Sequence, residues 1–168
     1  MTTKQADPEG KIVLDETELL RRLGELPRPL VFTNGVFDIL HKGHASYLHR
    51  AGCLGASLLV AVNSDSSVRQ LGKGDDRPIN GELDRAFMLA ALSSTTLITF
   101  FTEKTPIRLI SIIRPDIYVK GGDYDMEKLE ETALVRSWGG RSLALPFVNG
   151  YSTTQMVLKV KASPNAQC

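Results

Sequence analysis

Cysteine and long apolar runs are both scarce in this 168-residue sequence. The two cysteines, Cys53 and Cys168, are too few for a disulfide framework and too few for a thiolate metal site. No apolar stretch approaches the roughly 20 residues that span a bilayer. The polar segment Met1–Gly10 also lacks a signal-peptide core. We therefore expect a cytoplasmic protein without a membrane segment.

An excess of charge of either sign is also missing. Lys and Arg total 20 and Asp and Glu total 19, which gives a formal net charge of +1. This balance argues against a nucleic-acid partner, although a few local cations suffice to bind a small anionic ligand. With 42% hydrophobic and 23% charged residues, the chain can bury one core of ordinary domain size.

Short apolar segments alternate with amphipathic ones along most of the chain. Strands are predicted at residues 30–32, 57–62, 97–101, 117–119 and 142–145. Helices are predicted at 43–54, at 80–92 with Asn80 as cap, from Pro106 onward with Thr105 as cap, at 126–138 and at 152–161. Residues 63–80 are predicted to be mostly loop. This order predicts an α/β fold with a single doubly wound, Rossmann-like parallel sheet of five strands and helices on both faces.

The alternating pattern also suggests domain boundaries. We predict one domain at residues 30–161. Residues 1–29 would form an N-terminal extension, in which a flexible lead-in precedes one helix that starts with a capping box of Asp15 and Glu18. Residues 162–168 are predicted to be a flexible tail.

Four loops begin where predicted strands end, and they are rich in Gly, His, Lys, Asp, Ser and Thr. They are Thr33–His44, Asn63–Pro78, Lys120–Asp125 and Asn149–Thr154. Ligands of open parallel sheets bind outside the carboxyl ends of the strands. We therefore expect the functional site at this edge of the sheet.

The first of these loops carries the most distinctive pattern, His41-Lys42-Gly43-His44, at a predicted helix start. Neither a GxGxxG dinucleotide fingerprint nor a P-loop is present. Helix-start N–H groups favour anions, Gly43 lets a phosphate approach the backbone, and both histidines can donate to phosphoryl oxygens. Two alternatives remain, namely surface histidines beside a helix cap and a metal site to which only Asp38 could add a ligand.

With its flanking residues this pattern, GVFDILHKGH, resembles the G-x-F-D-x-x-H-x-G-H motif of the cytidylyltransferase-like nucleotidyltransferases. Three further blocks follow in the order of that family: VNSDSSVRQLGKGDDRPI, the pair Asp84-Arg85, and Tyr151-Ser152-Thr153-Thr154. Together the blocks cover residues 30 to about 160. The resemblance implies that the predicted domain is a nucleotidyltransferase of the Rossmann-like HxGH fold.

Within this family, the segments Glu103–Pro106 and Arg114–Tyr124 and the run LPFVNGYSTT most closely resemble enzymes that adenylylate D-glycero-β-D-manno-heptose 1-phosphate. The resemblance implies transfer of AMP from ATP to that sugar phosphate, giving ADP-heptose and pyrophosphate for lipopolysaccharide core or surface-polysaccharide precursors. One alternative is a cytidylyltransferase that uses CTP and glycerol 3-phosphate or another small phospho-alcohol. A second alternative is a nucleotide-binding module without catalysis.

One family position differs from the cytidylyltransferases in an informative way. Those enzymes usually carry an arginine before the last block, and Phe147 occupies that position here. This difference weakens the CTP alternative. It leaves another cation to hold the nucleotide phosphates: Lys73, Arg77, Arg85 or Lys120.

The resemblance also implies a role for each matching residue. Catalytic roles, which stabilise the α-phosphoryl group and the leaving pyrophosphate, are expected of His41, His44 and Lys73. Nucleotide contacts are expected from Thr33, Asn34, Gly35, Phe37, Gly43, Arg85, Lys120, Gly121, Gly122, Asp123, Ser152, Thr153 and Thr154. Contacts with the acceptor substrate are expected from Asp38, Asn63, Asp65 and Arg77. Mg²⁺ is expected to bridge oxygens of ATP with few protein ligands, and the chain is expected to form a homodimer or higher homo-oligomer.

Simpler structural roles remain open for some of these residues. Asp38, Asp65 and Ser152 could serve only as helix caps. Arg85 could lie on the solvated face of an amphipathic helix. The pair Gly121-Gly122 could serve only the geometry of a turn.

Overall fold

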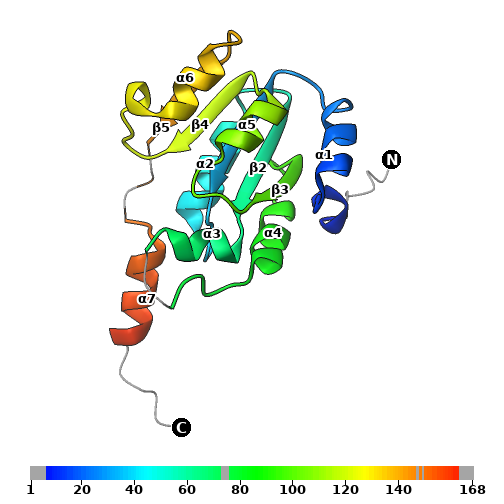
Figure 1. Ribbon diagram of the computed structural model, residues 1–168. Coiled ribbons are helices and arrows are strands. Elements are labelled where there is room, and N and C mark those ends of the chain that lie inside the picture. The colour runs from blue at the N-terminus through cyan, green and yellow to red at the C-terminus, as the bar shows by residue number, and fades with distance from the viewer. Residues whose placement is uncertain (1–6, 73–75, 147, 149, 163–168) are drawn as a thin grey trace.

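Five strands form one parallel sheet in the computed structural model, which describes residues 7–72, 76–146, 148 and 150–162 (Figure 1). The strands are β1 (Leu30–Gly35), β2 (Ser57–Asn63), β3 (Leu97–Phe101), β4 (Ile117–Gly121) and β5 (Arg141–Leu145). Their order across the sheet is β3-β2-β1-β4-β5, and each neighbouring pair is parallel. The predicted five-stranded parallel sheet is confirmed.

Helices cover both faces of this sheet, as predicted. They are α1 (Glu16–Leu23), α2 (Lys42–Gly52), α3 (Asp65–Gln70), α4 (Glu82–Ala90), α5 (Ile107–Ile113), α6 (Glu130–Arg136) and α7 (Thr153–Ala162). Helices α2 and α4 contribute to the core on one face, and α1, α5 and α6 contribute to the core on the other. Helix α7 extends away from the rest of the molecule (Figure 1).

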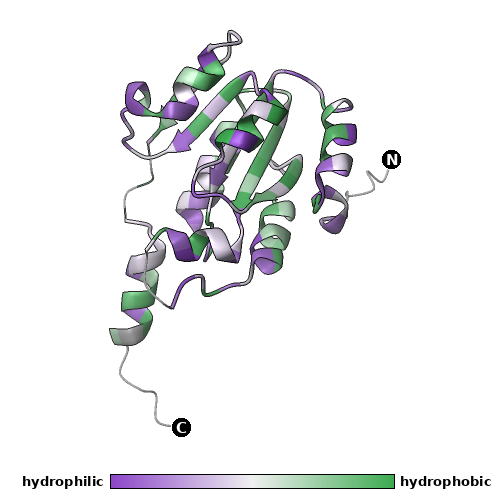
Figure 2. Ribbon diagram, in the orientation of Figure 1, coloured by the Kyte–Doolittle hydropathy of each residue, from purple (hydrophilic) through white to green (hydrophobic). Residues whose placement is uncertain are grey.

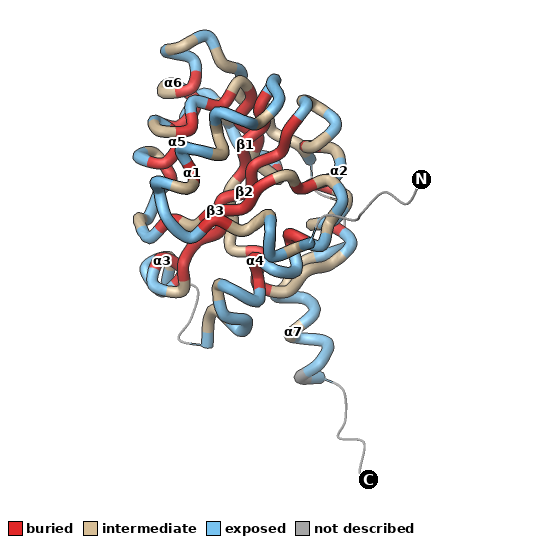
Figure 3. The backbone as a smooth tube through the Cα atoms, turned by 90° about the vertical axis from the view of Figure 1, so that its right-hand side faces the viewer, coloured by how far each residue is buried: buried red, intermediate tan, exposed pale blue. Residues whose placement is uncertain are grey.

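The central strands are buried on both sides, which explains their unbroken apolar sequences. All seven residues of β2 are buried. Hydrophobic residues follow the central strands in Figure 2, and the same strands form the buried centre of the molecule in Figure 3. A strand covered on both faces has no solvent side, so apolar and polar residues do not alternate along it.

The segment before α1 packs against the sheet, so the prediction of a flexible lead-in is wrong for residues 7–14. The Val13 N–H donates to the Ile98 carbonyl at 2.9 Å, and Val13 is almost fully buried. Asp15 then caps α1 by accepting from the Glu18 N–H at 2.9 Å, as predicted. The N-terminal segment therefore shares the core of the domain.

Two predicted helix caps are wrong. Helix α4 begins after Gly81 without a side-chain cap, because the Asn80 side chain donates instead to the Asp38 carbonyl. Helix α5 begins after Pro106, also without a side-chain cap, and Thr105 lines a cavity. At Asn80 a tertiary hydrogen bond replaces the local one that the sequence predicts.

Three predicted segments differ in extent from the observed ones. The predicted loop at 63–80 contains α3, which Ser64 caps through its side chain. The predicted helix at 126–138 is divided into a short 3₁₀ turn, η2 (Met126–Lys128), and α6, because Leu129 between them is extended. Ala162 still belongs to α7, and the rest of the predicted tail lies outside the described residues. Among the described residues, no helix has the length and apolar character needed to cross a membrane.

The sheet order determines where a ligand can bind. Strand β1 has β2 on one side and β4 on the other, so the winding direction reverses between β1 and β4. Crevices at the carboxyl ends of strands form at such a switch point. The first and third of the four predicted loops begin here.

Candidate active site

Two stacked histidines mark the start of α2. His41 is the N-cap residue, and its Nδ1 accepts a hydrogen bond from the His44 N–H at 3.3 Å. The two ring centroids lie 3.8 Å apart, and the ring planes are 13° from parallel. Gly43 makes room for this arrangement, because a Cβ there would lie 3.0 Å from the His41 ring and 3.1 Å from Tyr151 Cβ. The backbone of the helix start therefore fixes the imidazole pair.

The environment keeps both imidazoles neutral at pH 7. Burial, together with the nearby His41, lowers the pKa of His44 to about 4. Burial also lowers the pKa of His41. Since Nδ1 of neutral His41 accepts the hydrogen bond from the helix backbone, its proton lies on Nε2 and can be donated to a ligand.

Phe37 holds His44 in position from the other side. Its ring meets the His44 ring edge to face with centroids 5.3 Å apart, and it covers Gly35, where a Cβ would lie 3.0 Å from the Phe37 ring. Phe37 is buried and has a φ of 51°, a left-handed conformation that is rare for a bulky residue. Strain of this kind is often retained at functional sites.

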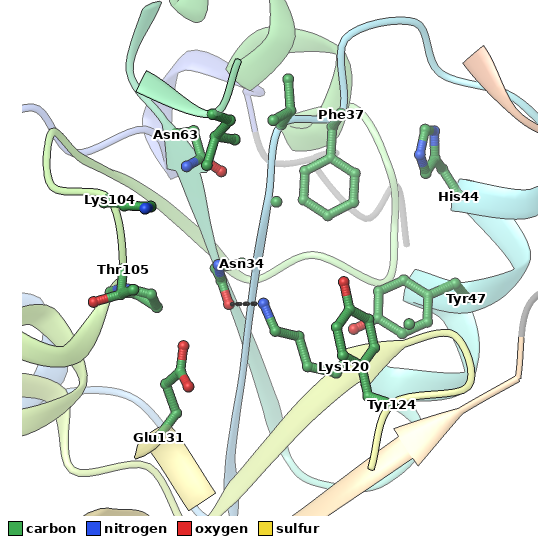
Figure 4. Close-up of a pocket in the computed structure, with 15 residues that line it drawn as sticks. Asn34, Phe37, His44, Tyr47, Asn63, Lys104, Thr105, Lys120, Tyr124 and Glu131 are labelled. Atoms are coloured by element: carbon green, nitrogen blue, oxygen red, sulfur yellow. Dashed lines mark hydrogen bonds between the residues drawn. The ribbon is translucent and has the colours of Figure 1, made fainter. Parts of the chain in front are cut away.

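A first cavity of about 420 Å³ opens at the carboxyl ends of β1 and β4 (Figure 4). Seven predicted site residues line it: Asn34, Gly35, Phe37, His44, Asn63, Lys120 and Gly121. Asn34 Oδ1 accepts from Lys120 Nζ at 3.3 Å, which joins the ends of the two strands. The predicted position of the site at the switch point agrees with this cavity.

A second cavity, also of about 420 Å³, adjoins the first. Six predicted site residues line it: Phe37, Asp38, His44, Arg77, Thr153 and Thr154. His44 and Phe37 thus contact both cavities. The sequence-based grouping of nucleotide and acceptor residues does not match this division, because Asn63 lies in the first cavity whereas Asp38 and Arg77 lie in the second.

Asp38 and Arg77 form a buried ion pair at the wall of the second cavity. Arg77 donates to the Asp38 carboxylate at 2.8 Å, and the N–H groups of Ile79 and Asn80 donate to its other oxygen. Asp38 therefore caps no helix but connects the segment before α4 to the loop before α2. Within the described part of the chain, the remaining guanidinium N–H groups of Arg77 have no partner.

Arg85 is fully buried, so the structure contradicts its predicted contact with nucleotide phosphates. Its guanidinium donates to three backbone carbonyls and to the Asp65 carboxylate, which lies 2.7 Å away. The alternative of a solvated helix face is equally wrong. Asp65 lines neither cavity and caps no helix, since Ser64 caps α3. The pair instead connects the loops after β1 and β2.

Thr33 is also fully buried, so its side chain lines neither cavity and any nucleotide contact at this position falls to the main chain. Its hydroxyl lies 2.6 Å from the Tyr47 hydroxyl, which donates to the Val119 carbonyl at 3.1 Å. Burial raises the pKa of Tyr47, so the phenol stays protonated. This chain of hydrogen bonds connects α2 to both central strands.

The loop after β4 turns at Gly122, which has a φ of 118° and donates its N–H to Leu145 at 2.8 Å. A φ in this range favours glycine, so the turn explanation holds for Gly122. Asp123 is exposed and lines neither cavity. Only Lys120 and Gly121 of the four predicted residues reach the first cavity.

At α7, Ser152 accepts from the Gln155 N–H at 3.1 Å, so it is the helix cap that the simpler alternative described. Thr153 and Thr154 follow it and line the second cavity. The predicted catalytic Lys73 and the substituted position Phe147 lie outside the described residues.

Sequence reasoning missed several residues that line the first cavity: Tyr47, Lys104, Thr105, Tyr124 and Glu131. Lys104 and Thr105 lie between β3 and α5, and Glu131 lies in the first turn of α6. The segment Glu103–Pro106 served as evidence of family resemblance, yet nothing in its pattern indicated a cavity. Glu131 belongs to no motif, so only the fold could reveal it.

Comparison with known proteins agrees with this geometry. A sequence model of the cytidylyltransferase-like family matches residues 32–158. A protein of Bordetella bronchiseptica named D-beta-D-heptose 1-phosphate adenylyltransferase is 59% identical over 155 residues, which cover 91% of this chain and 95% of that protein. The paired histidines at the carboxyl edge of the sheet define a nucleotidyltransferase. The chain belongs to the cytidylyltransferase-like family.

Longer relatives and solved structures extend the comparison. A bifunctional protein HldE of Helicobacter acinonychis is 47% identical over 153 residues, and the match spans only 32% of that protein. The crystal structure of a lipopolysaccharide core biosynthesis protein from Thermoplasma volcanium matches with a TM-score of 0.59 at 29% identity, over 71% of this chain and 95% of that one. Pantothenate synthetase from Thermus thermophilus, at 15% identity and a TM-score of 0.56, shares the fold over 82% of this chain and 62% of that one.

Proposed function

We propose that this protein transfers AMP from ATP to D-glycero-β-D-manno-heptose 1-phosphate and releases ADP-heptose and pyrophosphate. The named activity of the 59% identical relative supports this reaction. The structural observation that carries it is the stacked pair of His41 and His44, of which His44 lines both cavities. In a displacement at phosphorus, one cavity can hold the attacking acceptor and the other can hold the leaving pyrophosphate.

The reaction needs positioning more than it needs a base. A phosphate oxygen of the acceptor attacks the α-phosphorus, a new P–O bond forms, and the bond to the β-phosphate oxygen breaks with its electron pair leaving on pyrophosphate. The attacking oxygen is already an anion at pH 7, so no proton has to be removed. His41 and His44 donate N–H groups to the α-phosphoryl oxygens as negative charge shifts toward the leaving group.

We propose the following contacts among the described residues. Thr153, Thr154 and Arg77 hold nucleotide phosphates from the second cavity, and Arg77 uses the donors that Asp38 leaves free. The first cavity offers polar contacts to a substrate from Asn34, Asn63 and Lys120. Gly35 lines the first cavity, and Gly43 leaves room for the His41 ring.

We further propose that ATP enters as its Mg²⁺ complex. No cluster of three His, Cys, Asp or Glu side chains occurs in the part of the chain that the structure describes. Mg²⁺ commonly takes one or two protein ligands together with substrate phosphates, and these residues fit a cation carried by the triphosphate. Carried in this way, Mg²⁺ would neutralise charge on the phosphate oxygens.

We also propose that the reaction takes place in the cytoplasm and that the chain works as a homodimer or higher homo-oligomer. The exposed apolar side chains of Leu83, Phe87 and Met88 along α4 support an interface there. Light scattering coupled to size-exclusion chromatography measures the assembly directly. A monomer at micromolar concentration contradicts this part of the proposal.

A pyrophosphate-release assay that crosses ATP and CTP with heptose 1-phosphate and glycerol 3-phosphate tests the proposed reaction. We expect turnover with ATP and the heptose phosphate. Preference for CTP with glycerol 3-phosphate would favour a cytidylyltransferase, and ATP binding without turnover of any acceptor would indicate a non-catalytic module. His41→Ala and His44→Ala should each lower kcat by about 100- to 1,000-fold. His49→Ala, on the exposed side of α2, is the matched control.

A further inference from the structure

Glu131 is a buried residue whose carboxylate has no hydrogen-bond or ion-pair partner among the residues that the structure describes. It is 7% exposed and lines the first cavity from α6. Figure 4 shows its carboxylate directed into the cavity, toward the space that Asn34 and Thr105 enclose. A carboxylate that faces a cavity in this way is available to accept hydrogen bonds from a ligand.

Several polar residues share this cavity with Glu131, among them Lys120, which donates to Asn34. Lys104 and Thr105 come from the segment after β3, and Asn34 comes from the end of β1 (Figure 4). Within the described chain, Lys104 has no hydrogen-bond or ion-pair partner. This end of the cavity thus offers a cation for a phosphate and carboxylate and amide oxygens for hydroxyl groups. A phosphorylated polyol presents both kinds of group.

The two cavities differ in the charged side chains that line them. The second cavity contains Arg77 and the start of the ten-residue helix α7, and its one carboxylate, Asp38, is neutralised by Arg77. That cavity suits pyrophosphate. The first cavity carries charged groups of both signs, because Lys104 and Lys120 line it together with Glu131. Since attacking and leaving oxygens lie roughly in line at phosphorus, the acceptor approaches His44 from the side opposite to pyrophosphate.

We propose that Glu131 binds hydroxyl groups of the acceptor sugar in the first cavity and so determines which sugar 1-phosphate is used. This inference rests on the proposed function and names the acceptor side of the same site. A carboxylate accepts hydrogen bonds from two neighbouring hydroxyls at once, and it accepts none from an acceptor that lacks them. Glu131 lies at the far end of the cavity from His44, so it acts on binding of the sugar and not on the transfer step.

Glu131→Ala and Glu131→Gln test this role, with the exposed neighbour Glu130→Ala as the matched control. We expect Glu131→Ala to raise the KM for heptose 1-phosphate by about 10- to 100-fold, the effect of losing a hydrogen bond to a charged group, and to leave the KM for ATP within about twofold. Glu131→Gln should fall between the wild type and Glu131→Ala. Because neither substitution removes a hydrogen bond or ion pair within the described residues, neither variant should unfold at a clearly lower temperature than the wild type.

Deoxy analogues of the acceptor identify the contact itself. In the wild type, removing a hydroxyl that Glu131 binds should lower kcat/KM by about 10- to 100-fold. In Glu131→Ala the same deoxy analogue should lower kcat/KM by less than about threefold, because the substitution has already removed that interaction. Equal losses in both proteins for every analogue would overturn the inference.

The remaining outcomes separate the inference from the proposed function. A raised KM for ATP with an unchanged KM for the sugar would assign Glu131 to the ribose and overturn the inference. An active wild type whose Glu131 variants keep both KM values would also overturn it while leaving the proposed reaction intact. A wild type that releases no pyrophosphate with heptose 1-phosphate would overturn the reaction, and the inference with it.

Discussion

The His44 ring lies face to face with the His41 ring, 3.8 Å away, and edge to face with the Phe37 ring on its other side. Two aromatic neighbours exclude water from an imidazole without offering it an acceptor. A protonated His44 would be poorly solvated and close to a second imidazole. This packing explains why the ring is held neutral and available as an N–H donor.

The first prediction concerns pH. Burial places the pKa of His44 at about 4 in the folded protein, below its ordinary value of 6.5. The unfolded chain therefore binds more protons between these values, and the free energy of unfolding should fall as the pH drops from 6.5 to 4. We expect a contribution of roughly 2 kcal/mol, allowing for solvent screening of a partly exposed ring.

NMR titration of the histidine ring signals measures this pKa directly. Urea unfolding of the wild type and of His44→Gln at pH 7 and at pH 4 measures the stability term, and the variant should lose less stability on acidification. A His44 midpoint near 6.5 would contradict the prediction. Binding of ATP should raise the midpoint, because phosphate favours the protonated ring.

The second prediction concerns Gly43. In Gly43→Ala the new Cβ would meet the His41 ring at 3.0 Å and Tyr151 Cβ at 3.1 Å, so the imidazole pair has to shift. We expect kcat to fall by about 100-fold, since small misplacement of catalytic groups has effects of this size. Stability should change by no more than about 1 kcal/mol, because alanine itself favours the helix.

Gly81→Ala is the control for this substitution, because a Cβ there meets nothing closer than 3.9 Å. Its kcat should match that of the wild type. Full activity of Gly43→Ala with an undisturbed His41 would show that the pair tolerates the shift and would contradict the proposed geometry.

The third prediction concerns Arg85. Arg85→Ala leaves Asp65 and three backbone carbonyls without their buried donor. We expect a loss of about 3–5 kcal/mol in the free energy of unfolding, measured with urea. The exposed Arg69→Ala should change stability by less than about 0.5 kcal/mol. A stable Arg85→Ala protein with a raised KM for ATP would restore the direct phosphate contact that the sequence predicts.

The fourth prediction concerns Thr33. Thr33→Val keeps the shape of the buried side chain and removes its hydrogen bond to Tyr47. We expect a loss of about 1 kcal/mol in stability. The KM for ATP should stay within about twofold of the wild type, since the hydroxyl does not face a cavity. A large kinetic effect at unchanged stability would contradict this structural role.

The sequence predicted the sheet well because its strands are buried on both faces, and an unbroken apolar run such as 57–62 has few other interpretations. It also predicted the histidine pair, since the helix start and Gly43 form a local motif. Predictions failed where distant residues compete with local hydrogen bonds. Asn80 was expected to cap α4, but Asp38 provides it with a partner 42 residues away.

Burial of charged groups was the least predictable feature of the site. Arginine is usually exposed, so nothing in the sequence around Arg85 indicated that its guanidinium would lie at the centre of four hydrogen bonds. Glu131 and Lys104 are far apart in the sequence and meet only because α5 and α6 pack on the same face of the sheet. Such residues become recognisable only when the sheet order is known.

The strand order β3-β2-β1-β4-β5 places transfer chemistry and acceptor recognition on separate pieces of chain. The histidines belong to the crossover after β1, whereas Lys104 and Glu131 belong to crossovers on the opposite layer. Substitutions in those outer crossovers could therefore redirect the enzyme to other phosphorylated alcohols without disturbing the histidine pair. Exchanging these crossover segments between proteins of this fold offers a direct route to new nucleotide-activated sugars.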